Sequence, residues 1–155
     1  MPIPMIRAHD KILQCDGVEA INARQLDTFP YEYPGKRIDL LIETNEFTAV
    51  CPFSGLPDFG TVRVKYVPGA KCIELRSLKY YLISYRTVGI YYEHAVNRIL
   101  DDLVGCCDPE EMTVELEYTP RGGMRTVAVA RYSRGKRTKG TRRTKGTRGA
   151  QAPKA

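Results

Sequence analysis

The sequence predicts an α+β domain in which a four-stranded antiparallel sheet carries two helices on one face. Apolar residues alternate with polar ones in two segments before the middle of the chain and in two more near its end. Between these pairs, apolar residues recur at three- and four-residue steps, which is typical of amphipathic helices. A chain of 155 residues is also long enough to bury one core. The predicted order is strand, strand, helix, helix, strand, strand.

Four segments are predicted as strands. Residues 37–44 and 61–66 form the first pair, and residues 113–118 and 126–130 form the second. Between the last two, residues 119–123 contain a proline and two glycines, which favour a hairpin turn. A single layer of helices leaves the other sheet face uncovered, so we expect the protein to form oligomers.

Two helices are predicted between the strand pairs. Apolar residues follow helical spacing from Leu75 to Tyr85 and again from Ala95 to Leu103. We expect the second helix to end near Gly105, because glycine is favoured just after a helix C-terminus. The less periodic residues 1–36 are expected to wrap around the edge of the domain.

The net charge of +6 is concentrated at the C-terminus. From Arg131 onward there are ten basic residues and no acidic ones, whereas the preceding 130 residues contain 14 basic and 18 acidic ones. We therefore predict a single domain over residues 1–132 and a basic, disordered tail over residues 133–155. The charge balance argues against a nucleic-acid-binding surface spread over the domain. The tail either attracts phosphate backbones or merely improves solubility.

The expected location of the protein is the cytoplasm. No stretch approaches the roughly 20 apolar residues that cross a membrane, and residues 1–5 lack the features of a signal peptide. The five cysteines are therefore expected to be reduced thiols. His9 and His94 are far apart in sequence, and no histidine or cysteine spacing is typical of a metal site, so we expect no metal.

The segment over residues 51–60 is the richest in reactive groups. Two prolines and two glycines predict an irregular, rigid loop between the first two strands. Cys51 and Asp58 lie seven residues apart and converge if this loop folds back. A thiolate is a strong nucleophile, and a nearby acid can protonate what it attacks. The pattern alone is equally compatible with a buried apolar Cys51 and an Asp58 that caps a turn.

A second segment, residues 74–81, begins the first predicted helix. Arg76 and Lys79 lie three residues apart and, with the N–H groups of the helix start, form a candidate phosphate grip. No glycine-rich nucleotide-binding motif is present, so phosphate binding would depend on these cations. The alternative is a solvated helix face. Glu93 is either a ligand-holding carboxylate or an acidic residue favoured at a helix start.

Together these motifs resemble a known family, the nitrile oxidoreductases of the queuosine pathway (QueF). The resemblance runs from about Leu26 to Tyr132 and is closest to the short, single-domain form. Its motifs are Glu46-Phe47-Thr48, the Cys-Pro-x-Ser-Gly-x-Pro-Asp-Phe loop at 51–59, the octet at 74–81, and Glu93 with Asn97-Arg98-Ile99. The resemblance implies a tunnelling fold, whose sheets pair edge to edge into an oligomeric barrel. A decamer of two pentamers with active sites between subunits is expected.

The implied reaction is the NADPH-dependent reduction of the nitrile 7-cyano-7-deazaguanine to 7-aminomethyl-7-deazaguanine in the biosynthesis of queuosine, a tRNA modification. Cys51 matches the nucleophile that forms a covalent thioimide with the nitrile carbon, and Asp58 matches the proton donor. Two glutamates match carboxylates that grip the guanidine-like edge of the substrate. The implied substrate-binding residues are Ile73, Glu74, Leu75, Tyr92 and Glu93, and the implied NADPH-binding residues are Arg76, Ser77 and Lys79.

The sequence departs from the family pattern at two positions. Tyr92 stands where many relatives have histidine, and a phenol with a pKa near 10 is a poorer acid–base group at neutral pH. We therefore expect Tyr92 to pack on the substrate or to form a hydrogen bond with it. Ala95 stands where some relatives have a second cysteine that forms a protective disulfide, so that pairing is not expected here.

Three other functions stay open from the sequence. The first is an amidinotransferase that acts on nitrile-bearing tRNA through the same cysteine adduct; its branch lacks the octet at 74–81, although the basic tail favours RNA contact. The second is a pterin- or GTP-processing hydrolase of the same fold, which usually requires zinc ligands. The third is a non-enzymatic nucleic-acid-binding module whose affinity would lie in residues 133–155.

Overall fold

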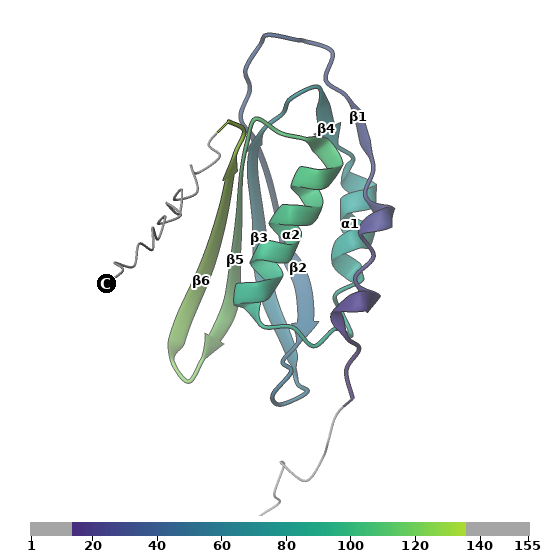
Figure 1. The fold of residues 1–155 in the computed structure, drawn as a ribbon. Coiled ribbons are helices and arrows are strands. Elements are labelled where there is room, and N and C mark those ends of the chain that lie inside the picture. The colour runs from purple at the N-terminus through teal and green to yellow at the C-terminus, as the bar shows by residue number, and fades with distance from the viewer. Residues whose placement is uncertain (1–13, 136–155) are drawn as a thin grey trace, which may run out of the picture.

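The computed structural model describes residues 14–135, so the predicted tail over residues 133–155 lies almost entirely outside the described residues. Four long strands form an antiparallel sheet in the order β2-β3-β5-β6, and two helices pack on one face of it (Figure 1). The predicted α+β class is confirmed. The elements are β2 (Leu40–Val50), β3 (Pro57–Val67), α1 (Leu75–Ile83), α2 (Tyr92–Cys107), β5 (Glu111–Arg121) and β6 (Met124–Ser133).

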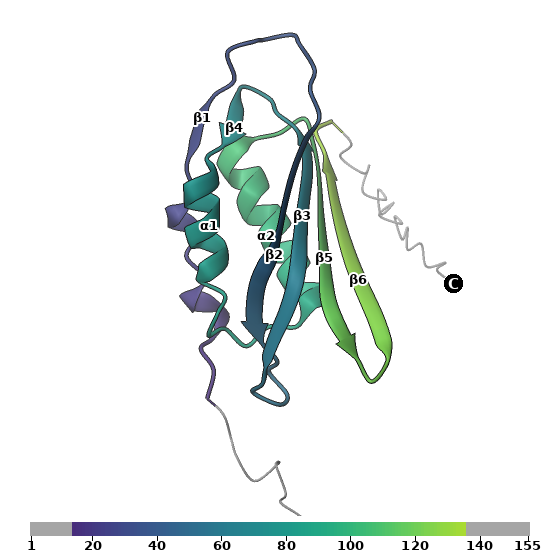
Figure 2. The same ribbon diagram turned by 180° about the vertical axis from the view of Figure 1, so that it is seen from behind.

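Four short elements were not predicted. They are two 3-10 helices, η2 (Val18–Ala20) and η3 (Ala23–Gln25), and two strands, β1 (Thr28–Pro30) and β4 (Lys71–Ile73). The two strands pair with each other in an antiparallel sheet of their own. The N-terminal segment that carries η2, η3 and β1 runs beside α1, as Figure 2 shows from the far side of the sheet. Elements of three residues are too short to display a periodicity that the sequence alone would reveal.

The strands are longer than the alternation predicted. In β3, Val62, Val64 and Tyr66 are buried against the helices, as the alternation requires. In β2 the pairing register shifts between Thr44 and Phe47. This β-bulge moves the buried positions from even to odd residue numbers, which is why the second half of β2 was not predicted from its alternation.

The helix α2 extends beyond Gly105, so the predicted helix end is wrong by two residues. Leu103 and Cys107 are both fully buried and lie four residues apart on one helix face, which favours continuing the helix through the glycine. The helix instead ends at Cys107 and is followed by the C-cap residue Asp108, which adopts a left-handed conformation with φ of 46°.

A polar network connects the two helices inside the core. The hydroxyl of the fully buried Tyr81 donates to Asp102 Oδ2 at 2.8 Å and lies 2.8 Å from the hydroxyl of Tyr85. Arg98 Nε donates to the same carboxylate oxygen at 2.7 Å. Because each charged or polar group has a partner, the network fixes α1 against α2 at little cost in desolvation.

Within residues 14–135, no helix or strand covers the other face of the sheet, which we call the open face and which carries ion pairs. Arg63 Nη1 lies 2.7 Å from a carboxylate oxygen of Glu115 and 2.8 Å from one of Glu117, and Arg125 Nε lies 2.6 Å from the second oxygen of Glu117. In the part of the chain that the structure describes, no strand pairs with the outer edges of β2 and β6. Neither helix in this part has the length and apolar character to cross a membrane.

Candidate active site

Cys51 and Asp58 lie at the turn that joins β2 to β3. Only residues 51–56 form a loop, because β3 begins at Pro57 and Asp58 pairs with Ala49 of β2. The prediction of an irregular segment through residue 60 is therefore wrong in its second half. Two backbone hydrogen bonds close the loop, one from Cys51 N to Leu56 O at 2.9 Å and one from Gly55 N to Cys51 O at 2.8 Å. The tight turn places Cys51 and Asp58 at the same end of the sheet.

The surroundings of Cys51 favour its thiolate. The residue is 8% exposed, and this burial raises the pKa of the thiol. Hydrogen bonds from the side chain and backbone of Ser54, from the backbone of Phe53 and from Arg121 outweigh burial and lower the pKa to about 7. The thiolate, which is the nucleophilic form of cysteine, is therefore more accessible at neutral pH than in an ordinary cysteine.

Other buried cysteines behave in the opposite way. Burial raises the pKa of Cys107 to about 12 and also raises the pKa of Cys72. Both are the inert, apolar thiols expected of a protein core. Cys51 thus differs from them in its hydrogen bonds rather than in its burial, and the interpretation of Cys51 as a merely structural residue is not supported.

Asp58 is 4% exposed, and its carboxylate forms an ion pair with the guanidinium of Arg121. Arg121 ends β5 and pairs with Met124 across a two-residue turn. Gly122 and Gly123 occupy this turn with φ of 56° and 76°, a backbone conformation that favours glycine. We predicted only a turn here and missed Arg121 as a site residue. The signal in the sequence was a cation directly before a hairpin turn at the end of the sheet that carries Cys51.

Tyr92 and Glu93 begin α2 at this same end of the sheet. Ile90 N, just before the helix, donates to Val50 O at 3.1 Å, which places the helix start beside Cys51. The ring of Tyr92 packs on that of Tyr118, with 4.4 Å between the ring centroids. The structure therefore brings Cys51, Asp58, Tyr92 and Glu93 to one end of the sheet.

Tyr118 is a further residue of this end that the sequence did not single out as part of the site. It pairs with Gly60 of β3, and its side chain is 4% exposed. Its hydroxyl has no hydrogen-bond partner among residues 14–135. Burial is the largest cause that raises the pKa of this phenol, so it is neutral at all ordinary pH values.

The predicted substrate-binding residues Ile73, Glu74 and Leu75 lie at the opposite end of the sheet. Ile73 is 2% exposed, and its N–H donates to the hydroxyl of Tyr66 at 3.0 Å. Tyr66 and Asp58 are eight residues apart on β3, which corresponds to about 26 Å of strand. Figure 1 shows the start of α1 and the β2–β3 turn at opposite ends of the sheet. Ile73, Glu74 and Leu75 therefore do not meet Cys51 of the same chain.

Glu74 caps the N-terminus of α1. Its carboxylate accepts hydrogen bonds from Arg76 N at 2.9 Å and Ser77 N at 2.7 Å, and these bonds lower its pKa. The hydroxyl of Ser77 is also occupied, since it donates to Glu74 O at 2.7 Å and accepts from Asp27 N at 2.9 Å. The prediction that N–H groups of this helix start help to grip a phosphate is wrong for the observed state, because Glu74 occupies them.

The two predicted cofactor cations lie on the exposed side of α1. Arg76 is exposed, and Lys79 forms an ion pair with Glu46 at the bulge of β2. Both side chains are available to anions at the surface. Within residues 14–135, no three histidine, cysteine, aspartate or glutamate side chains are grouped so that they could hold a metal ion.

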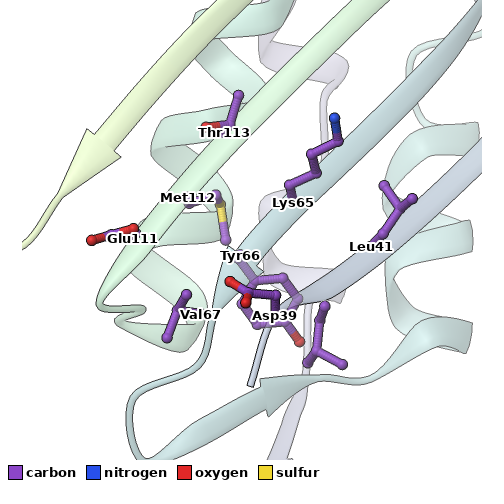
Figure 3. Close-up of a pocket in the computed structure, with 9 residues that line it drawn as sticks. Asp39, Leu41, Lys65, Tyr66, Val67, Glu111, Met112 and Thr113 are labelled. Carbon is purple, nitrogen blue, oxygen red and sulfur yellow. The ribbon is translucent and has the colours of Figure 1, made fainter. Parts of the chain in front are cut away.

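A hollow of about 360 Å³ opens at the end of the sheet away from Cys51, among β2, β3 and β5. Figure 3 shows several of its lining side chains, including Asp39, Lys65, Tyr66 and Thr113. None of the predicted catalytic residues lines it. A smaller hollow of about 310 Å³ lies on the open face beside Phe59 and Tyr118, next to the turn that carries Cys51 and Asp58.

One end of this α+β fold thus carries a thiol of lowered pKa and a buried carboxylate, and a thiolate is the nucleophilic form of cysteine. Comparison with protein families makes the assignment specific. The family model described as QueF-like protein matches residues 57–137. The chain belongs to the QueF family.

Two relatives illustrate the degree of similarity. A protein of Caldicellulosiruptor bescii is 52% identical over 118 residues, which cover 76% of this chain and 90% of the relative. A protein of Chlorobaculum tepidum is 48% identical over 116 residues, which cover 75% of this chain and 99% of the relative. Both are named NADPH-dependent 7-cyano-7-deazaguanine reductase.

A solved structure shares the fold at lower similarity. The apo form of the archaeosine synthase QueF-Like superimposes with a TM-score of 0.56 and 22% sequence identity, over 64% of this chain and 95% of that one. At this identity the likeness supports the fold and carries no information on the reaction.

Proposed function

We propose that the protein reduces 7-cyano-7-deazaguanine to 7-aminomethyl-7-deazaguanine with NADPH as the reductant, in queuosine biosynthesis. The observation that carries this proposal is the identity of about half of the aligned residues with reductases of this name, over about three quarters of the chain. The archaeosine synthase is much less similar, so an amidinotransferase is not favoured. The low pKa of Cys51 is the chemical property that the nitrile reaction needs.

The proposed first step is the addition of Cys51 to the nitrile carbon. Asp58 is ion-paired with Arg121, so it starts as a carboxylate and can accept the proton of the Cys51 thiol. The sulfur then forms a bond to the nitrile carbon, and Asp58 returns the same proton to the nitrogen. One C–S bond forms, the triple bond becomes a double bond, and the product is a neutral thioimide.

The reduction of this intermediate needs two hydride equivalents per nitrile, which NADPH supplies when bound. Arg76 and Lys79 suit the phosphates of that cofactor, because both are exposed cations on one helix. Lys79 would exchange its partner Glu46 for a phosphate. Ser77 supports this helix start through its hydrogen bonds to the backbone rather than from an exposed position.

The separation of the site residues supports an oligomer. A substrate with the size of a purine base cannot contact both Glu93 and Glu74 of the same chain, because these residues lie at opposite ends of a sheet whose strand β3 extends about 26 Å from Asp58 to Tyr66. We propose that a second copy contributes Ile73, Glu74 and Leu75 to each site. The free edges of β2 and β6 and the open sheet face support the edge-to-edge barrel of a tunnelling fold, and we propose a decamer of two pentamers.

The test is to mix the protein with 7-cyano-7-deazaguanine and NADPH and to follow the nicotinamide absorbance together with the intact mass. We expect two NADPH molecules to be consumed per nitrile, and a protein adduct when NADPH is omitted. Cys51→Ala should abolish the adduct, whereas Cys106→Ala, which removes a thiol of raised pKa, should retain it. An adduct without NADPH oxidation would instead indicate the amidinotransferase. The absence of both the adduct and NADPH oxidation would refute the proposal.

A further inference from the structure

Arg121 contacts both reactive groups of the proposed site. Its guanidinium forms the ion pair with Asp58, and Arg121 is also among the groups that lower the pKa of Cys51. We propose that Arg121 is a positioning residue, which holds the Asp58 carboxylate against Cys51 and keeps it ionised, ready to accept the thiol proton. This inference rests on the proposed function, because it assigns a role within the same reaction.

The burial of Asp58 makes such a partner necessary. A carboxylate that is 4% exposed loses most of its hydration, and without a cation it would take up a proton and remain neutral. Among residues 14–135, Arg121 is the one cation within ion-pair distance of Asp58. A neutral Asp58 could not accept the proton of Cys51, so the thiolate would form less readily. By keeping Asp58 ionised, the ion pair with Arg121 allows the first proton to move from the Cys51 thiol to the Asp58 carboxylate.

The backbone of the hairpin turns Arg121 toward the site. In β5, residues with odd numbers such as Glu115 and Glu117 face the open side, whereas Asp58 lies on the helix side. Regular alternation would therefore place Arg121 on the open side as well. The pairing of β5 with β6 shifts register between Tyr118 and Arg121, and this irregularity lets the side chain reach Asp58.

The chemistry of the side chain also matches the role. A guanidinium has five N–H donors in a planar arrangement, so one Arg121 can bond to a carboxylate and a sulfur at once. Lysine carries the same charge on a single nitrogen and would hold the two groups less well. The variants Arg121→Gln and Arg121→Lys therefore separate the charge from the geometry.

Arg125 provides a matched control on the same hairpin. It is the same residue type, four positions away, and its guanidinium pairs with Glu117 on the open face instead of with Asp58. A general effect of removing a hairpin arginine, such as a loss of stability or of net charge, should appear equally in Arg121→Gln and Arg125→Gln. An effect through Cys51 and Asp58 should appear in the first variant only.

The experiment measures the alkylation of Cys51 by iodoacetamide as a function of pH, with the modified peptide identified by mass. In the full-length wild type we expect a midpoint near pH 7. In Arg121→Gln the midpoint should rise and the rate at about pH 7 should fall about three- to ten-fold, because less thiolate is present. Arg121→Lys should lie between the two, and Arg125→Gln should match the wild type. The rate of adduct formation with 7-cyano-7-deazaguanine should follow the same order.

The outcomes distinguish this inference from the proposed function. Equal midpoints in the wild type, in Arg121→Gln and in Arg125→Gln would overturn the role of Arg121, even if the wild type reduces the nitrile. If Arg121→Gln does not fold, a wild-type midpoint in Arg121→Lys overturns the part of the role that depends on the planar guanidinium. A wild type that forms no adduct with the nitrile would refute the proposed function. The alkylation profiles would still show whether Arg121 governs the thiol.

Discussion

Tyr118 bears a hydroxyl that is buried without a hydrogen-bond partner in the described part of the chain. An unsatisfied buried polar group costs about 1–3 kcal/mol. We predict that Tyr118→Phe raises the free energy of unfolding by about 1 kcal/mol, as measured by urea denaturation. Tyr66→Phe is the control, because the hydroxyl of Tyr66 accepts a hydrogen bond from Ile73 N; its loss should lower stability by about 1 kcal/mol. Equal losses in both variants would mean that the Tyr118 hydroxyl has a partner beyond the described residues, in this chain or in a second subunit.

Glu74 makes the stability of the protein depend on pH. Its pKa is lowered in the folded state by hydrogen bonds from the N–H groups of Arg76 and Ser77. A carboxylate with a depressed folded pKa stabilises the protein above its unfolded pKa, and the contribution disappears as the pH falls through the folded pKa. We predict that Glu74→Gln lowers the urea midpoint at about pH 7 and that the difference from wild type vanishes in acid. A difference that is the same at both pH values would contradict this assignment.

Asp58 permits a third prediction at the residue scale. Asp58→Asn removes the acid and base but keeps the size of the side chain, so the nitrile should still bind. We expect the rate of NADPH oxidation at saturating nitrile to fall about 100-fold or more, since general acid–base catalysis typically contributes this much. Single-turnover absorbance measurements, with binding followed by calorimetry, would separate the two effects. A variant that turns over at the wild-type rate would remove Asp58 from the proposed mechanism.

The site residues at the end of the sheet that carries Cys51 could be predicted from the sequence only in part. The spacing of Cys51 and Asp58 around a turn indicated that they converge, and the structure brings them to one turn. Arg121 could not be predicted as their partner, because its direction depends on a register shift near the hairpin that no sequence pattern displays. The low pKa of Cys51 likewise depends on hydrogen bonds to Ser54 that exist only once the loop has closed.

At the scale of elements, the network around Asp102 is the feature that joins α1 to α2. Its carboxylate accepts from Tyr81 and from Arg98, so Asp102→Ala leaves two donors without their partner. We predict a loss of about 2 kcal/mol in the free energy of unfolding, measured by urea denaturation. Asp101→Ala is the matched control: it removes the neighbouring, exposed carboxylate and should change stability by less than about 0.5 kcal/mol. Similar losses in both variants would show that the network contributes little.

Element boundaries were predicted less well than element types. The helices and the cores of the four long strands follow from periodicity, because burial of one face imposes it. The second half of β2 was missed because the bulge between Thr44 and Phe47 changes which residues face the core. Gly105 was taken as a helix end because glycine favours that position, but packing of Leu103 and Cys107 overrides the local preference.

At the scale of the whole molecule, the proposed sharing of sites between subunits can be tested by complementation. Cys51→Ala and Glu74→Ala should each be inactive alone, since each removes a different half of every site. Co-expressed at equal levels, they should recover about a quarter of wild-type NADPH oxidation, because random assembly leaves that share of sites intact. Cys51→Ala with Asp58→Asn should recover none, as both residues belong to the same end of one chain. Equal recovery in both mixtures would argue against shared sites.

The sequence alone predicted an oligomer only through the uncovered sheet face and the family resemblance. The distance between Cys51 at one end of the sheet and residues 73–75 at the other could not be predicted, because it depends on the direction in which α1 leaves β4.

This distance has a consequence for how the sequence changes over generations. With sites shared between subunits as we propose, a substitution near Ile73 changes the chemistry of an adjoining molecule, about one strand length from the Cys51 of its own chain. Natural selection therefore acts on the two ends of β3 jointly. A substitution that impairs the site at one end should be compensated by a substitution at the other end. Lineages of this protein should exchange such residues in pairs that no contact within one chain explains.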